Sequence, residues 1–75
     1  MGYRLSKKRL KVLRAERDKT QIQVAHGARL PVARYWYLES GGGLATADEV
    51  KAIADFLGVS TRRLGATPAS EPMSA

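Results

Sequence analysis

Apolar residues recur along the chain with the spacing of short amphipathic helices, and turn-forming residues separate one group from the next. Leu10 and Leu13 fall three residues apart in a basic segment, which predicts a first helix within residues 6–17. Thr20 and Gln23 then stand in the S/T-x-x-E/Q relation of a capping box, so a second helix is expected to begin at Gln21. Its narrow apolar stripe consists of Val24, Ala25 and Ala28.

Pro31 divides the second helix from a third. The residue before a proline is pushed out of the helical region, so the break is expected near Arg29 and Leu30. Pro31 itself suits the first turn of a new helix, where its missing N–H has no intrahelical use. Three glycines, residues 41–43, are expected to end this third helix.

A second capping box, Thr46 with Glu49, predicts a fourth helix that ends at Leu57. Its buried stripe is expected to contain Val50, Ile53, Ala54 and Leu57. Ser60 is a suitable cap for a short fifth helix over residues 61–64. No alternating apolar pattern is long enough to predict a strand, so the expected fold is all-α, with five helices in one compact domain.

The predicted domain occupies residues 1–65, and the remaining residues differ in composition. Residues 66–75 contain two prolines, several small residues and little to bury, so we expect a flexible, disordered tail. A chain of 75 residues has room for one small core. No apolar run approaches the length of a membrane span and no secretory signal is present, so a cytoplasmic protein is expected.

The third helix has two distinct faces when it is drawn at 100° per residue. One side gathers Tyr35, Leu38 and Glu39, and the opposite side gathers Ala33, Trp36, Tyr37 and Ser40. Arg34 and Val32 lie on the two flanks. The outward face is therefore expected to be small and aromatic, with an arginine at its edge.

Charge and candidate chemistry narrow the function. The net charge is +6, and the basic excess lies in the first half, where ten lysines and arginines stand against three acidic residues before Ser40. Such a half attracts a polyanion such as nucleic acid, although a solvated face is an equally good explanation of charge alone. There is no cysteine, and the single histidine, His26, has no nucleophile, orienting acid or metal-ligand cluster with it. Neither an enzyme nor a bound metal or cofactor is expected.

Two short helices around a tight turn, with a cationic flank, are typical of a helix-turn-helix DNA reader, although ordinary helical bundles also contain such pairs. Val32 and Ala33 would then contact thymine methyl groups, Tyr37 would offer a hydroxyl, and Arg34 would reach guanine or a phosphate. We also place Arg29, in the turn, among the candidate DNA contacts. Trp36 would lie along the groove wall, contact a protein partner, or pack on basic side-chain stems.

A longer pattern supports this interpretation without a gap from Leu10 to Leu64. Its matching residues are Leu10, Leu13, Arg14, Thr20, Gln21, Ala25, Leu38, Glu39, Gly41, Ile53, Ala54, Leu57, Gly58, Val59 and Leu64. With them, the chain resembles the Cro and lambda-repressor-like, or Xre, family of bacterial and phage regulators. The resemblance implies a five-helix domain whose third helix enters the major groove.

The resemblance also implies roles for single residues. Gln21 would bind a phosphate at the start of the second helix, and Val32, Ala33 and Tyr37 would read bases. Arg34 and Ser40 would contact the DNA backbone, whereas Arg14 and Glu39 would form a pair inside the domain. The sequence departs from the family pattern at Arg29 and Pro31, where a glycine and a Ser or Thr are usual, and at Gly42 and Gly43, where polar residues are common.

Two hypotheses about partners follow from this pattern. The first is a regulator, expected to be a repressor, that binds double-stranded DNA as a homodimer. Phe56 lies off the buried stripe of the fourth helix and is a candidate dimer contact, together with Arg62 and Arg63; capping of the domain edge is the alternative for Phe56. The second is a protein-interaction module, such as an antitoxin-like or accessory subunit, that uses the Trp36 and Tyr37 surface.

Overall fold

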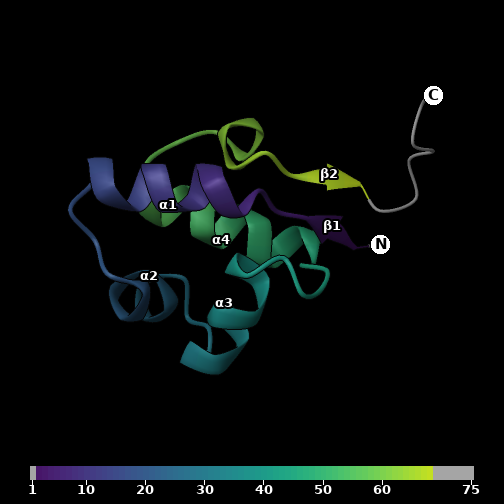
Figure 1. The fold of residues 1–75 in the computed structure, drawn as a ribbon, viewed down its shortest axis with the longest axis horizontal. Coiled ribbons are helices and arrows are strands. Elements are labelled where there is room, and N and C mark those ends of the chain that lie inside the picture. The colour runs from purple at the N-terminus through teal and green to yellow at the C-terminus, as the bar shows by residue number, and fades with distance from the viewer. Residues whose placement is uncertain (1, 69–75) are drawn as a thin grey trace.

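The computed structural model describes residues 2–68, which form a mostly helical domain with a small antiparallel sheet (Figure 1). The elements in chain order are β1 (Tyr3–Arg4), α1 (Lys7–Glu16), α2 (Gln21–Gly27), α3 (Val32–Glu39), α4 (Ala47–Leu57), the 3-10 helix η1 (Thr61–Leu64) and β2 (Thr67–Pro68). In Figure 1, α1 and η1 lie along one edge of the domain, α3 lies at the other edge, and α4 runs between them.

Both capping boxes expected from the sequence are confirmed. The Thr20 hydroxyl accepts a hydrogen bond from the Gln23 backbone N–H, while the Gln23 side chain accepts one from the Thr20 N–H. Thr46 and Glu49 form the same reciprocal pair at the start of α4. Gly58 takes a left-handed conformation, with φ of 71°, at the end of α4.

The apolar stripes of the helices meet in one core. Every residue of the stripes expected for α2 and α4 is buried, as are Leu10 and Leu13 of α1. The further buried apolar residues are Leu5, Tyr35, Leu38, Ala45 and Leu64. The core thus draws on all four α-helices and on η1, so α3 rests on a packed base.

The fold differs from the expected five α-helices at its C-terminal end. Residues 2–68 contain four α-helices, and the expected fifth is the 3-10 helix η1. A segment of four residues between Ser60 and Gly65 has room for little more than one turn, and the tighter 3-10 winding is usual for pieces of this length. Its one buried side chain, Leu64, still packs into the core.

The structure also contains strands that the sequence did not predict. Tyr3 pairs with Pro68 and Arg4 with Thr67, and Tyr3 exchanges two backbone hydrogen bonds with Ala45 at N···O distances of 2.7 and 2.8 Å. The predicted start of the flexible tail at residue 66 is therefore too early, because Ala66 packs against the core and Thr67–Pro68 form β2. The rest of that expected tail, residues 69–75, lies outside the described residues.

The start of α3 is a smaller correction. Pro31 is the N-cap, with ψ of 142°, and the helix begins at Val32. The Pro31 carbonyl accepts the first hydrogen bond of the helix from the Tyr35 N–H at 3.0 Å. Within the described part of the chain, no helix is long and apolar enough to cross a membrane.

Candidate nucleic-acid interface

The turn between α2 and α3 caps the C-terminus of α2, and Arg29 occupies the left-handed position where glycine is usual. Arg29 has a φ of 59°, in the left-handed region. The Arg29 N–H donates to the His26 carbonyl at 3.0 Å, and the Leu30 N–H donates to the Ala25 carbonyl at 2.8 Å. These two bonds form a Schellman motif. Arg29, where the family pattern has a glycine, thus adopts this turn with a backbone strain of about 1–2 kcal/mol.

The two faces expected for α3 are confirmed. Tyr35, Leu38 and Glu39 are buried, whereas Ala33, Trp36, Tyr37 and Ser40 are exposed. Trp36 and Tyr37 each keep about half of their surface exposed, at 49% and 51%. Val32 is half-buried and packs against the core, so only part of its side chain remains available to a ligand.

The buried face of α3 carries a charged residue that is paired across the domain. Glu39 is 1% exposed and accepts two hydrogen bonds from the Arg14 guanidinium, at 3.0 Å from Nε and 2.7 Å from Nη2. Burial is the largest single influence and acts to raise the pKa of Glu39, but Arg14, Tyr35 and Gln21 together outweigh it, and the pKa lies below its ordinary value. The pair, which the family resemblance implied, ties the end of α3 to α1.

Two neighbours complete this buried site. Gln21 donates from Nε2 to the Glu39 carboxylate at 3.2 Å, so the amide that was expected to bind a phosphate is directed into the domain. The hydroxyl of Tyr35 is buried and has no hydrogen-bond partner among the described residues. Burial raises the pKa of that hydroxyl, and the adjacent Glu39 carboxylate raises it further. The Gln21 side chain therefore braces α2 against α3 in this structure.

Arg34 also differs from its expected placement. Its guanidinium donates to the Glu49 carboxylate at 2.9 and 2.8 Å and to the Leu44 carbonyl at 2.9 Å. The hydrogen bonds from Arg34 lower the pKa of Glu49. Glu49 lies in the first turn of α4, so the flank of α3 that holds Arg34 faces the capping-box carboxylate. Arg34 is thus bonded within the domain and 34% exposed, instead of standing free at the edge of α3.

The glycine run after α3 has a second role that the sequence did not reveal. An added Cβ would lie 2.9 Å from the Tyr37 ring at Gly42 and 2.1 Å from it at Gly43. The Tyr37 ring therefore rests directly on the loop backbone, where a larger residue would displace it. Ser40 donates its hydroxyl to the Tyr37 carbonyl at 2.8 Å, so this candidate backbone contact is also engaged locally.

The candidate dimer contacts lie on α4 and on η1. Phe56 is half-buried, and its ring lies 2.1 Å from the position of a Cβ added at Gly27 of α2. The Lys19 ammonium nitrogen stands 5.7 Å from the centroid of the same ring. Arg62 and Arg63 lie on η1, and Arg63 is 3.8 Å from the Glu16 carboxylate. Phe56 thus packs at the domain edge against α2, and a dimer role for these three residues stays a prediction.

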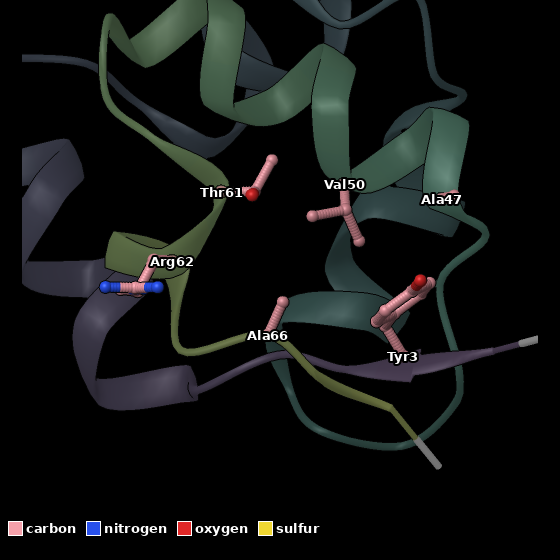
Figure 2. Close-up of a pocket in the computed structure, with 6 residues that line it drawn as sticks. All are labelled: Tyr3, Ala47, Val50, Thr61, Arg62 and Ala66. Carbon is pink, nitrogen blue, oxygen red and sulfur yellow. The ribbon is translucent and has the colours of Figure 1, made fainter. Parts of the chain in front are cut away.

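An open hollow lies between η1, α4 and β1 (Figure 2). Its volume is about 360 Å³, and its lining consists of Tyr3, Ala47, Val50, Thr61, Arg62 and Ala66. None of the exposed residues of α3 takes part in it.

Comparison with known proteins assigns the chain to a family. A family model described as "Helix-turn-helix domain" matches residues 8–66, which is most of the chain. No curated protein gives a significant match. The matched range contains α2, the Arg29 turn and α3, the arrangement with which helix-turn-helix domains bind DNA. The chain belongs to the helix-turn-helix domain family.

Proposed function

We propose that this protein is a sequence-specific transcriptional repressor of the Xre type. Its helix α3 would read double-stranded DNA in the major groove. The observation that carries the proposal is the exposed face of α3. Ala33, Trp36 and Tyr37 project from a helix whose opposite face is fixed by the core and by the Arg14 and Glu39 pair. A rigid helix with small and aromatic outward side chains fits the width of the major groove.

Each exposed residue has a chemically suitable contact. Ala33 and the free part of Val32 would meet thymine methyl groups, and the Tyr37 hydroxyl would bond a base edge. Trp36 would lie along the sugar-phosphate wall beside them. Arg29, at the start of the turn into α3, would bind a phosphate, which positions the helix without reading sequence.

The remaining family-derived contacts are weaker in this proposal. Arg34 would reach DNA only by leaving Glu49, and Gln21 only by leaving Glu39. Ser40 would still offer its exposed oxygen as an acceptor while it donates to Tyr37. Recognition would therefore depend mainly on methyl contacts, Tyr37 and the shape of the DNA.

We further propose that the regulator binds as a homodimer to a two-fold operator, with half-sites about one helical turn apart, roughly 34 Å. A single helix of eight residues contacts few base pairs, and a second copy would double the sequence that is read. Among the earlier candidates, Arg62 would be best placed for such an interface, since it lines the hollow beside η1.

Selection of bound sequences from random duplex DNA, followed by titration at several salt concentrations, tests the function. We expect enrichment of one sequence and a specific affinity that exceeds the non-specific affinity by about 10³-fold or more. Tyr37→Phe, which removes only the hydroxyl, should change the preferred base at one position. Val12→Ala is the matched control on exposed surface of α1 and should leave the preference unchanged.

The alternative is a protein-interaction module, and the half-exposed Trp36 and Tyr37 side by side on α3 favour it. The same experiment separates the two functions. If no sequence is enriched and binding to all duplexes falls uniformly with salt, the specific regulator is refuted and the aromatic face is left as a protein contact.

A further inference from the structure

A second open hollow lies between α1 and η1, away from the exposed face of α3. Its lining consists of Ser6, Lys8, Arg9, Val12, Leu13 and Arg63. Three of these side chains are cationic, and they come from opposite ends of the described chain. Figure 1 shows α1 and η1 at one edge of the domain and α3 at the other, with α4 between them. We call Lys8, Arg9 and Arg63 the cationic cluster.

The end of η1 holds the two sides of this hollow together. Gly65 has a φ of 70°, and a Cβ added there would lie 2.7 Å from the Ser6 Cβ and 3.0 Å from the Arg9 Cδ. The Ser6 N–H donates to the Leu64 carbonyl at 3.2 Å, and the Ser6 hydroxyl accepts from the Arg9 N–H. Because Gly65 has no side chain, the aliphatic stem of Arg9 can pack directly against the turn at the end of η1.

The charges of the cluster are largely uncompensated. Glu16 is the acidic residue beside it, 3.8 Å from Arg63 and 4.0 Å from Arg17. Neither Lys8 nor Arg9 forms an ion pair with another described residue, and both are exposed. Arg63 and Arg17 thus share the Glu16 carboxylate, and Lys8 and Arg9 have no carboxylate partner among the described residues. Such a site attracts an anionic polymer and opposes close packing of a second copy of itself.

We propose that the cationic cluster binds the phosphate backbone of a second DNA duplex, separate from the duplex at α3. Lysine and arginine head groups bind phosphate oxygens through charge-assisted hydrogen bonds, which carry no sequence information. Because α4 separates the cluster from α3, one straight duplex seated on α3 does not reach it. One protein molecule would then hold two DNA segments together.

A two-duplex capture assay with the full chain tests this proposal. The protein is bound to an immobilised duplex, and the retention of a fluorescent duplex of unrelated sequence is measured over a range of salt. The test variant is Lys8→Gln/Arg63→Gln, which leaves Arg9 seated on Gly65. The matched control, Arg4→Gln/Lys51→Gln, removes the same charge from exposed residues without ion pairs to described residues.

We expect the test variant to retain about tenfold less of the second duplex and to lower the salt slope of that retention by about 2, at roughly 0.9 for each phosphate contact. The control variant should remain within about twofold of the parent protein. An equal loss in both variants would show that total charge is responsible and would overturn the proposal. Undiminished retention in the test variant would also overturn the proposal, because a homodimer could then hold the two duplexes through its two copies of α3 without the cationic cluster.

Two further arms keep the outcomes distinct. If the test variant loses binding to vesicles of phosphatidylserine and phosphatidylcholine but still captures duplex DNA, the cluster binds membranes and the proposal fails. The readout does not depend on sequence recognition by α3. If selection enriches no sequence, the salt dependence of binding to an arbitrary duplex, compared between the test variant and the parent protein, still tests the cationic cluster. Failure of the proposed regulator function and failure of this site can therefore be distinguished.

Discussion

Replacing Arg14 with methionine leaves the Glu39 carboxylate buried without its cation. Glu39 is 1% exposed and Arg14 is 17% exposed, so most of the pair is removed from water. The two hydrogen bonds from Arg14 would be lost, and only the longer bond from Gln21, at 3.2 Å, would remain. Removing one partner of such a pair typically destabilises a protein by about 3–5 kcal/mol.

That loss is large for a domain of this size. At 0.05–0.15 kcal/mol per residue, a 75-residue chain has a free energy of unfolding of about 4–11 kcal/mol. Arg14→Met should therefore remove roughly half of it. The double variant Arg14→Met/Glu39→Met should lose less than Arg14→Met alone, because it leaves no buried charge and adds apolar volume.

Urea unfolding followed by circular dichroism gives the required free energies. Arg34→Met is the matched control, since it breaks a bidentate pair with Glu49 that is 34% and 15% exposed. Solvent screening limits such a pair to about 1 kcal/mol or less. Equal losses of unfolding free energy for Arg14→Met and Arg34→Met would refute the argument that burial sets the size of the loss. A double variant less stable than Arg14→Met would refute it as well.

The same pair predicts a dependence on pH whose sign follows from the pKa of Glu39. That pKa is lower in the folded protein than its ordinary value of 4.5, so the stabilisation is complete above the ordinary value and is lost as the pH falls through the folded value. The difference in unfolding free energy between the parent protein and Glu39→Gln should be constant near neutrality and shrink below about pH 4. A difference that grows on acidification would contradict this assignment.

Three further predictions concern backbone positions, and urea unfolding checks the first two. Gly27→Ala should destabilise the domain by about 1–3 kcal/mol, because the new Cβ would clash with the Phe56 ring and outweigh a helix-propensity gain of about 1 kcal/mol. In a Phe56→Leu background, the same substitution should stabilise the domain. Arg29→Gly should stabilise the domain by about 1 kcal/mol by relieving the positive φ, and a simultaneous fall in DNA affinity would identify Arg29 as a phosphate contact. Gly43→Ala should displace the Tyr37 ring and change the DNA sequences that are selected, and unchanged selection would remove Tyr37 from the reading surface.

The helices of this fold could be predicted because their signals are local. A capping box spans four residues, and both boxes of this chain are present as expected. The spacing of apolar residues likewise identified the buried faces of α2, α3 and α4. The strands were missed because a pair of two-residue strands has no alternation to detect, and their partners lie at the two ends of the chain.

The candidate interface was harder to predict where it depends on contacts between elements. The sequence identified Trp36 and Tyr37 as exposed, since that follows from the helical period alone. It did not reveal that Arg34 binds Glu49, which requires the placement of α3 beside α4. It also did not reveal the seat of Tyr37 on Gly43, because that contact depends on the path of the loop.

The engagement of Arg34 changes how DNA recognition by α3 should be understood. Glu49 accepts hydrogen bonds from Arg34 and from the Thr46 N–H, so its carboxylate fixes the start of α4 and the flank of α3 together. A phosphate or guanine that recruited Arg34 would have to replace two charge-assisted bonds, and the net gain would be smaller than for a free arginine. Side chains that need no such exchange, Ala33 and Tyr37 above all, should therefore carry more of the sequence preference than the one arginine on the helix.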